Sequence, residues 1–278
     1  MSMKKAISIL STLLLFGVIF MVSQIASALF VGLLGLRGDN GGFTDCGFFT
    51  FYVISMGMTL LLVTLLEKKQ YGIIKRIERK TSGFDPVSIL LGVIVLIALS
   101  IVQMPLCKLL PPRDFEVGDG AFMLLTIVII APIFEEIIFR GRLYNMLSNK
   151  LSPVFSAVIS ALAFGAVHLS PIVIIEGFFA GFVFSYFYVH RRSIIAPIIL
   201  HVCNNALAYA LIVLSYDDES LVDILGGHDN FIFVYIASII IVVVAATIMI
   251  ARFVKEKRRT ESSEDEDADV NPKTEDEE

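Results

Sequence analysis

The 278-residue chain has little charge and few cysteines. Charged residues make up 18% of it and hydrophobic residues 56%, whereas a soluble domain carries about 25% charged residues. No basic stripe interleaved with aromatic side chains appears outside the short loops, which excludes a nucleic-acid partner. The three cysteines form no CxxC pair and no zinc-ribbon spacing, which argues against a redox motif and a structural zinc site. The composition is that of a protein that crosses the membrane several times.

Eight apolar runs are candidates for membrane-spanning helices, which need about 20 residues. Backbone groups in hydrocarbon must be satisfied within the protein, and the runs lack the alternation of barrel strands. We therefore predict an all-α helical bundle with about eight transmembrane helices and the lipid bilayer as its first partner. The predicted spans are Ala6–Leu36, Phe48–Leu66, Pro86–Leu106, Ala121–Phe139, Pro153–Leu169, Pro171–Val189, Ile194–Ser215 and Phe231–Phe253.

Lysine and arginine are distributed unevenly between the loops that join these spans. With strict alternation, eighteen of them lie on the side of the N-terminus and three, Arg37, Lys108 and Arg113, lie on the other. Because basic residues concentrate in cytoplasmic loops, this predicts a multi-pass protein of the cell membrane with both termini in the cytoplasm.

Four parts of the chain differ in composition. Residues 1–120 contain the first three spans, residues 121–215 a candidate catalytic core of four spans, and residues 216–259 an acidic outer loop and the last span. Residues 260–278 form a tail in which ten acidic residues stand against one lysine from Glu261 onward. So few apolar residues cannot bury enough surface to fold, so we expect a disordered cytoplasmic tail.

Two adjacent carboxylates and an arginine interrupt the apolar segment Ala131–Gly141, which reads APIFEEIIFRG. Charge at bilayer depth is costly and usually marks function. On a helix, Glu136 and Arg140 are four residues apart with the acid first, which predicts an ion pair. Glu135 lies about 100° around the helix and is left for another partner. A general base is one role that such a buried carboxylate could take.

Five more polar residues lie within the following spans: His168, Glu176, His201, Asn204 and Asn205. Glu176 matches no motif and is interpreted as a cavity-lining or structural carboxylate. If spans four and five form a hairpin near Leu151, His168 lies at the same depth as Glu135. Ser170 and Pro171 follow His168 closely, so the fifth span is either short and buried or protrudes into the cytoplasm. The sequence leaves both arrangements open.

Three motifs resemble the CPBP (CAAX protease and bacteriocin-processing, or Abi) intramembrane endopeptidases, which include the CAAX prenyl endopeptidases. EExxxR runs from Glu135 to Arg140, FxxxH from Phe164 to His168, and HxxxN from His201 to Asn205, in the family's order and on separate spans. The similarity covers residues 121–211.

The resemblance implies a protease that hydrolyses membrane-tethered proteins or peptides. It implies that Glu135 and His168 activate a water molecule, that His201 and Asn205 stabilise the oxyanion, and that the remaining motif residues support them, namely Glu136, Arg140 and Phe164. Glu135, His168 and His201 could also hold Zn²⁺, but HExxH is absent. Metal-free glutamate catalysis therefore remains an alternative.

Other interpretations compete with a protease. A lone intramembrane histidine is more often a hydrogen bond between helices, and an ion pair at a helix end can reach the headgroups. The chain could also be a catalytically silent immunity or scaffold protein of the same fold, or a proton-coupled transporter. In the sixth span, Gly177 and Gly181 predict close helix packing, and the aromatic run Phe178–Tyr188 is interpreted as lipid-facing surface.

Overall fold

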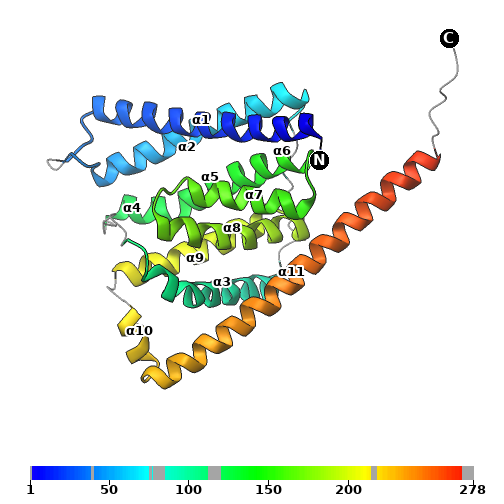
Figure 1. Ribbon diagram of the computed structural model, residues 1–278. Coiled ribbons are helices and arrows are strands. Elements are labelled where there is room, and N and C mark those ends of the chain that lie inside the picture. Colours follow the sequence, from blue (N-terminus) through cyan, green and yellow to red (C-terminus); the bar gives the residue numbers. More distant parts are fainter. Residues whose placement is uncertain are drawn as a thin grey trace, which may run out of the picture.

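The computed structural model describes residues 2–38, 41–74, 77, 85–111, 120–213 and 218–270, and these residues form helices and no strand. Figure 1 shows the helices lying side by side, with α11 crossing the others obliquely. The all-α prediction is confirmed. The elements are α1 (Met3–Leu33), α2 (Asp45–Tyr71), α3 (Pro86–Cys107), α4 (Ala121–Leu125), η2 (Thr126–Ile130), α5 (Ala131–Ile138), η3 (Phe139–Tyr144), α6 (Asn145–Ser148), α7 (Pro153–Ala166), α8 (Pro171–Arg191), α9 (Ile195–Val213), α10 (Asp218–Ile224) and α11 (His228–Val270).

Seven of the described helices, rather than eight, are long and apolar enough to cross a bilayer. The difference is α7, which has 14 residues and rises about 21 Å, short of a hydrocarbon core of about 30 Å. Hydropathy overcounted because the apolar run continues through the turn that follows Ala166. Of the two arrangements left open for the fifth span, the structure has the short helix.

The short α7 still reverses the direction of the chain. Successive long helices run back and forth, so α1 begins at the end of the bundle where α2 finishes (Figure 1). Several of the basic residues counted above, Lys75, Arg76, Arg79, Lys80 and Arg113, lie outside the described residues. Which end faces the cytoplasm stays a prediction.

The segment α4 to α6 is one continuous helical path of 28 residues, Ala121–Ser148, interrupted twice by π-helical turns. Each π turn leaves carbonyl groups outside the regular hydrogen-bond pattern of the α-helix, and such turns often occur at functional sites. Side chains satisfy three of them: Asn205 Nδ2 donates to Ile127 O (3.0 Å), Ser160 Oγ to Phe139 O (2.9 Å) and Asn145 Nδ2 to Gly141 O (2.9 Å). The two turns flank α5 and its paired carboxylates.

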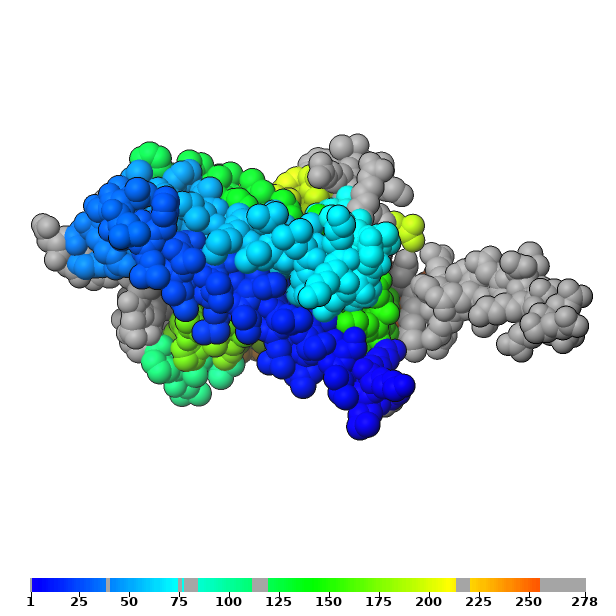
Figure 2. Space-filling view, turned by 90° about the horizontal axis from the view of Figure 1, so that it is seen from above, coloured from blue at the N-terminus to red at the C-terminus, as the bar shows by residue number. Residues whose placement is uncertain are grey.

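The helices α1 and α2 form a layer on one side of this path. Figure 2 shows that they occupy most of that face of the molecule. The Asp45 carboxylate at the start of α2 accepts from the backbone N–H groups of Phe122 (3.1 Å) and Met123 (2.6 Å), which open α4. Because these N–H groups have no partner within their own helix, the contact caps α4 and fixes α2 to it.

Two apolar clusters lie on either side of the α5 segment. One joins α3, α8, α9 and α11 through residues such as Phe184, Phe187 and Leu200. The other joins α1, α2, η3 and α7 through residues such as Phe16 and Phe139. The polar residues of the three motifs lie between them.

The hairpin of α7 and α8 is closely packed at glycines, as predicted. A Cβ on Gly177 would lie 3.1 Å from Gly165 Cα, and one on Gly181 would lie 2.9 Å from Arg140 Nη2. The interpretation of the aromatic run as lipid-facing surface is wrong for its second half, because Phe184, Tyr186, Phe187 and Tyr188 are buried. They fill the space left by small neighbouring residues.

The helix α11 continues to Val270 and so includes the first eleven residues of the segment for which disorder is predicted. The described helix therefore ends after residue 260, where the sequence predicts that the tail begins. Residues 271–278 lie outside the described residues.

Candidate active site

The predicted ion pair is present and forms the buried centre of the site. Arg140 Nη1 donates to Glu136 Oε1 at 2.8 Å, and both side chains are fully buried. Arg140 Nη2 donates to Gly181 O at 2.8 Å. The guanidinium also lies over the ring of Phe164, with Cζ 4.6 Å from the centroid. A buried charge needs such partners, and Arg140 obtains them from α5, α7 and α8.

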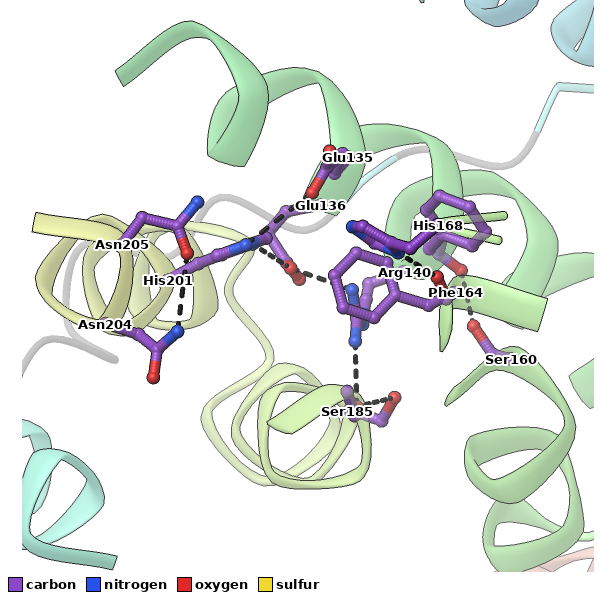
Figure 3. A network of polar contacts seen from close by, with 12 residues as sticks. Glu135, Glu136, Arg140, Ser160, Phe164, His168, Ser185, His201, Asn204 and Asn205 are labelled. Atoms are coloured by element: carbon purple, nitrogen blue, oxygen red, sulfur yellow. Dashed lines mark hydrogen bonds and ion pairs between the residues drawn. The ribbon is translucent and has the colours of Figure 1, made fainter. Parts of the chain in front are cut away.

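His201 of α9 lies between the two carboxylates of α5 (Figure 3). Its Nδ1 is 2.9 Å from Glu136 Oε1, and its Nε2 is 3.6 Å from Glu135 Oε2. The ring stacks on Phe184 with centroids 4.7 Å apart and meets Phe164 edge-on at 5.5 Å. A carboxylate only accepts hydrogen bonds, so Nδ1 carries a proton and Nε2 is directed at Glu135.

His168 lies in the turn between α7 and α8, and its ring contacts Phe164 rather than a carboxylate. The ring nitrogen Nδ1 is 2.9 Å from Phe164 O. Because a carbonyl only accepts, Nδ1 carries the proton, and in the neutral ring Nε2 is free to accept. The next residue, Leu169, has a left-handed backbone (φ 60°) and is exposed. This conformation is rare for leucine and lies in the turn between the end of α7 at Ala166 and the start of α8 at Pro171.

Phe164 connects the buried residues to one another. Its ring meets those of Phe139 (5.2 Å), His168 (5.1 Å) and His201 (5.5 Å), and it carries Arg140 on its face. The predicted supporting role of Phe164 thus corresponds to a contact with every motif that the sequence singled out.

Asn205 contacts the segment before α5. Its Nδ2 donates to Ile127 O, and its Oδ1 accepts from Asn204 Nδ2 at 3.3 Å. These contacts orient the amide and leave it one further N–H to donate.

The residues of the three motifs differ in burial. Glu136 and Arg140 are 0% exposed, His201 4% and Glu135 9%, whereas His168 and Asn205 are half-buried. His168 and Asn205 are therefore the most accessible of these six residues. A separate cavity of about 230 Å³, lined by Glu67, Tyr71, Ile73 and Asn149, lies at the far ends of α2 and α6 and contains none of the motif residues.

The site residues do not form a metal centre as they are arranged. Within the described ranges, no three His, Cys, Asp or Glu side chains come close enough to hold a metal ion. His168 turns its Nδ1 to a carbonyl, and Glu136 is bonded to Arg140. A zinc site needs at least three protein ligands directed at one point, so this arrangement does not fit the metal that the sequence left open.

Sequence reasoning missed Tyr52 of α2, whose hydroxyl donates to Glu135 Oε1. It also missed Ser160 and Ser185, which bond the carbonyl groups of Phe139 and Gly181. The one available signal for Tyr52 was a tyrosine near the start of an apolar span, because a buried tyrosine hydroxyl usually has a partner.

Fold and site together define a polytopic α-helical membrane protein with a buried glutamate, histidine and arginine network. Residues 118–207 match the family described as Type II CAAX prenyl endopeptidase Rce1-like. A Bacillus subtilis (strain 168) protein named "Putative membrane peptidase YdiL" is 34% identical over 83 residues. These findings support the resemblance to the CPBP family over the matched segment.

The similarity to these proteins is confined to the core. The alignment with the Bacillus subtilis protein covers 30% of this chain and 34% of that protein, so it spans about a third of the relative's length. No solved structure matches the chain. Spans α1 to α3 and α11 lie outside the matched residues 118–207.

Proposed function

We propose that this chain is an intramembrane endopeptidase that hydrolyses a peptide bond of a membrane-tethered protein or peptide. The observation that supports this most directly is that the two neighbouring carboxylates differ in their partners and in their exposure. Glu136 is neutralised by Arg140, whereas Glu135 is the more exposed carboxylate and lies 3.6 Å from His201 Nε2. Glu135 is therefore the carboxylate available to act on water.

In the proposed reaction, Glu135 and the Nε2 atom of His168 hold a water molecule, and Glu135 takes one of its protons. The hydroxide attacks the carbonyl carbon of the scissile bond, and the carbonyl oxygen becomes an oxyanion. Glu135 then returns its proton to the leaving amine as the C–N bond breaks. General bases of this kind contribute about 10² to 10⁴ in rate.

The oxyanion is proposed to accept from His201 Nε2 and Asn205 Nδ2. Since Nδ1 of His201 already donates to Glu136, a proton on Nε2 makes the ring an imidazolium. Before the reaction, Glu135 and Glu136 offset the positive charges of this imidazolium and of Arg140. Once Glu135 has taken the proton and is neutral, the oxyanion takes its place as the second negative charge. Loss of one oxyanion donor costs about 10² to 10³ in rate.

The substrate class follows from where the site lies. Residues on membrane-spanning helices reach a peptide that is itself held at the bilayer, and the description of the matched family names a CAAX prenyl endopeptidase. We propose a prenylated C-terminal peptide as the first probe and the same peptide without the prenyl group as the second. Cleavage of the first alone would show that the lipid is recognised.

The test uses purified full-length chain in detergent micelles, both probes, and mass mapping of the products with and without a chelator. We expect Glu135→Gln to lower kcat/KM at least about 10³-fold. The matched control is Glu67→Gln, which alters another buried carboxylate, one that Arg142 holds at 3.0 Å outside the site. A Glu135→Gln enzyme as fast as wild type, or no product from either probe, would contradict the proposal.

A further inference from the structure

Tyr52 contacts the proposed base from a helix that no motif includes. It lies on α2, outside the matched residues 118–207. Its hydroxyl donates to Glu135 Oε1 across 83 positions of sequence. A hydrogen bond to a charged acceptor is stronger than one between neutral groups, so this contact acts directly on the carboxylate that the proposed reaction uses.

The two oxygen atoms of Glu135 thereby have different surroundings. Oε1 accepts from Tyr52, and Oε2 lies 3.6 Å from His201 Nε2. The terminal torsion of a glutamate is broad and roughly two-fold when nothing holds it. Contacts from α2 on one side and from α9 on the other restrict that rotation. Each oxygen of Glu135 therefore keeps its own neighbour.

The helix that carries Tyr52 is fixed to the segment that carries Glu135. Asp45 caps α4 through the N–H groups of Phe122 and Met123, and α4 leads through η2 into α5. The Tyr52 ring lies against Phe48, with centroids 6.2 Å apart. A positioning group needs support of this kind, because loosely held groups lose catalytic geometry.

We propose that Tyr52 is a positioning residue of the active site. Its hydroxyl holds Oε1 of Glu135 and leaves Oε2 as the atom that takes the proton from water. This inference rests on the proposed endopeptidase function. It adds a residue of α2 to the site residues that lie within the matched segment.

The first test compares two tyrosines of α2. Tyr52→Phe removes the hydroxyl that contacts Glu135. Tyr71→Phe removes a hydroxyl that donates to Met146 O at 3.0 Å, away from the site. We expect Tyr52→Phe to lower kcat about 10-fold to 100-fold, the loss of one hydrogen bond to a charged group, with KM within about 2-fold. Tyr71→Phe should keep the kcat of wild type. Equal kcat values for the two variants would overturn the proposal.

The second test does not depend on activity. Unfolding in micelles is measured for wild type, Tyr52→Phe, Glu135→Ala and the double variant, because a double-mutant cycle isolates the direct contact. We expect the double variant to lose less stability than the sum of the single losses. Strict additivity would overturn the contact. If wild type cleaves neither probe but the coupling is present, the endopeptidase function fails while the Tyr52–Glu135 pair stands.

Discussion

The helices α8 and α11 both read as membrane spans, but they face different surroundings. The most apolar window of α11 is the most hydrophobic of the seven and is 6% buried, whereas that of α8 is 44% buried. The helix α8 supplies Gly181 O to Arg140 and Phe184 to His201. Of these two helices, the more apolar one is covered least by the rest of the protein, whereas α8, which contains glycine and serine, packs around the site.

This contrast predicts where substitutions are costly. A helix packed against lipid exchanges one apolar environment for another, so its side chains contribute little to folding within the bilayer. A helix packed around a buried charge holds partners that cannot be replaced by water or lipid. The three substitutions below compare positions of the two kinds, from the largest expected effect to the smallest.

Arg140→Met should be the most damaging. It leaves Glu136 buried and without its cation, and breaking a buried ion pair by removing one partner costs about 3 to 5 kcal/mol. The comparison is Arg252→Met on α11, where an exposed arginine donates to Tyr186 Oη at 2.9 Å and the loss should stay below about 1 kcal/mol. Denaturant titration in micelles measures both. Equal losses would break the contrast between core and α11.

Gly165→Ala should come next. Its new methyl carbon would lie 2.4 Å from Ile174 O, and backbone on both sides prevents relaxation, so we expect a loss of about 3 kcal/mol. Gly57→Ala on α2 is the matched control, because its Cβ meets no atom within 4 Å and alanine favours a helix by about 1 kcal/mol. A tolerated Gly165→Ala would show that the α7–α8 contact is looser than the structure has it.

Asp85→Asn should have the smallest effect. The Ser88 hydroxyl, followed by the Val87 N–H and the Arg191 guanidinium, holds the pKa of Asp85 below its ordinary value. A lowered pKa means that Asp85 stabilises the fold above about pH 4, its unfolded value, and that this contribution is lost as pH falls through the folded value. The difference in unfolding midpoint between wild type and Asp85→Asn should be present at pH 7 and absent in strong acid. A difference in unfolding midpoint that becomes larger as the pH falls would contradict this predicted pH dependence.

Much of the fold could be predicted because apolar runs and the i, i+4 pair are local features. The pairing of Glu136 with Arg140 needs only the helical repeat, and the structure confirms it at 2.8 Å. The count of spans was wrong because hydropathy cannot tell where a helix stops inside an apolar run. The turn after α7 includes the left-handed backbone of Leu169, a conformation that the residue type leucine does not predict.

The sequence by itself determined an all-α membrane bundle, the family of its core and the residues of its three motifs, because each of these is written in short stretches of residue type and spacing. Only the tertiary structure decided how those residues meet. It set His201 between Glu135 and Glu136, turned His168 to Phe164, and brought Tyr52 to Glu135 from α2. Contacts between helices depend on their rotation and depth, and a linear pattern carries neither.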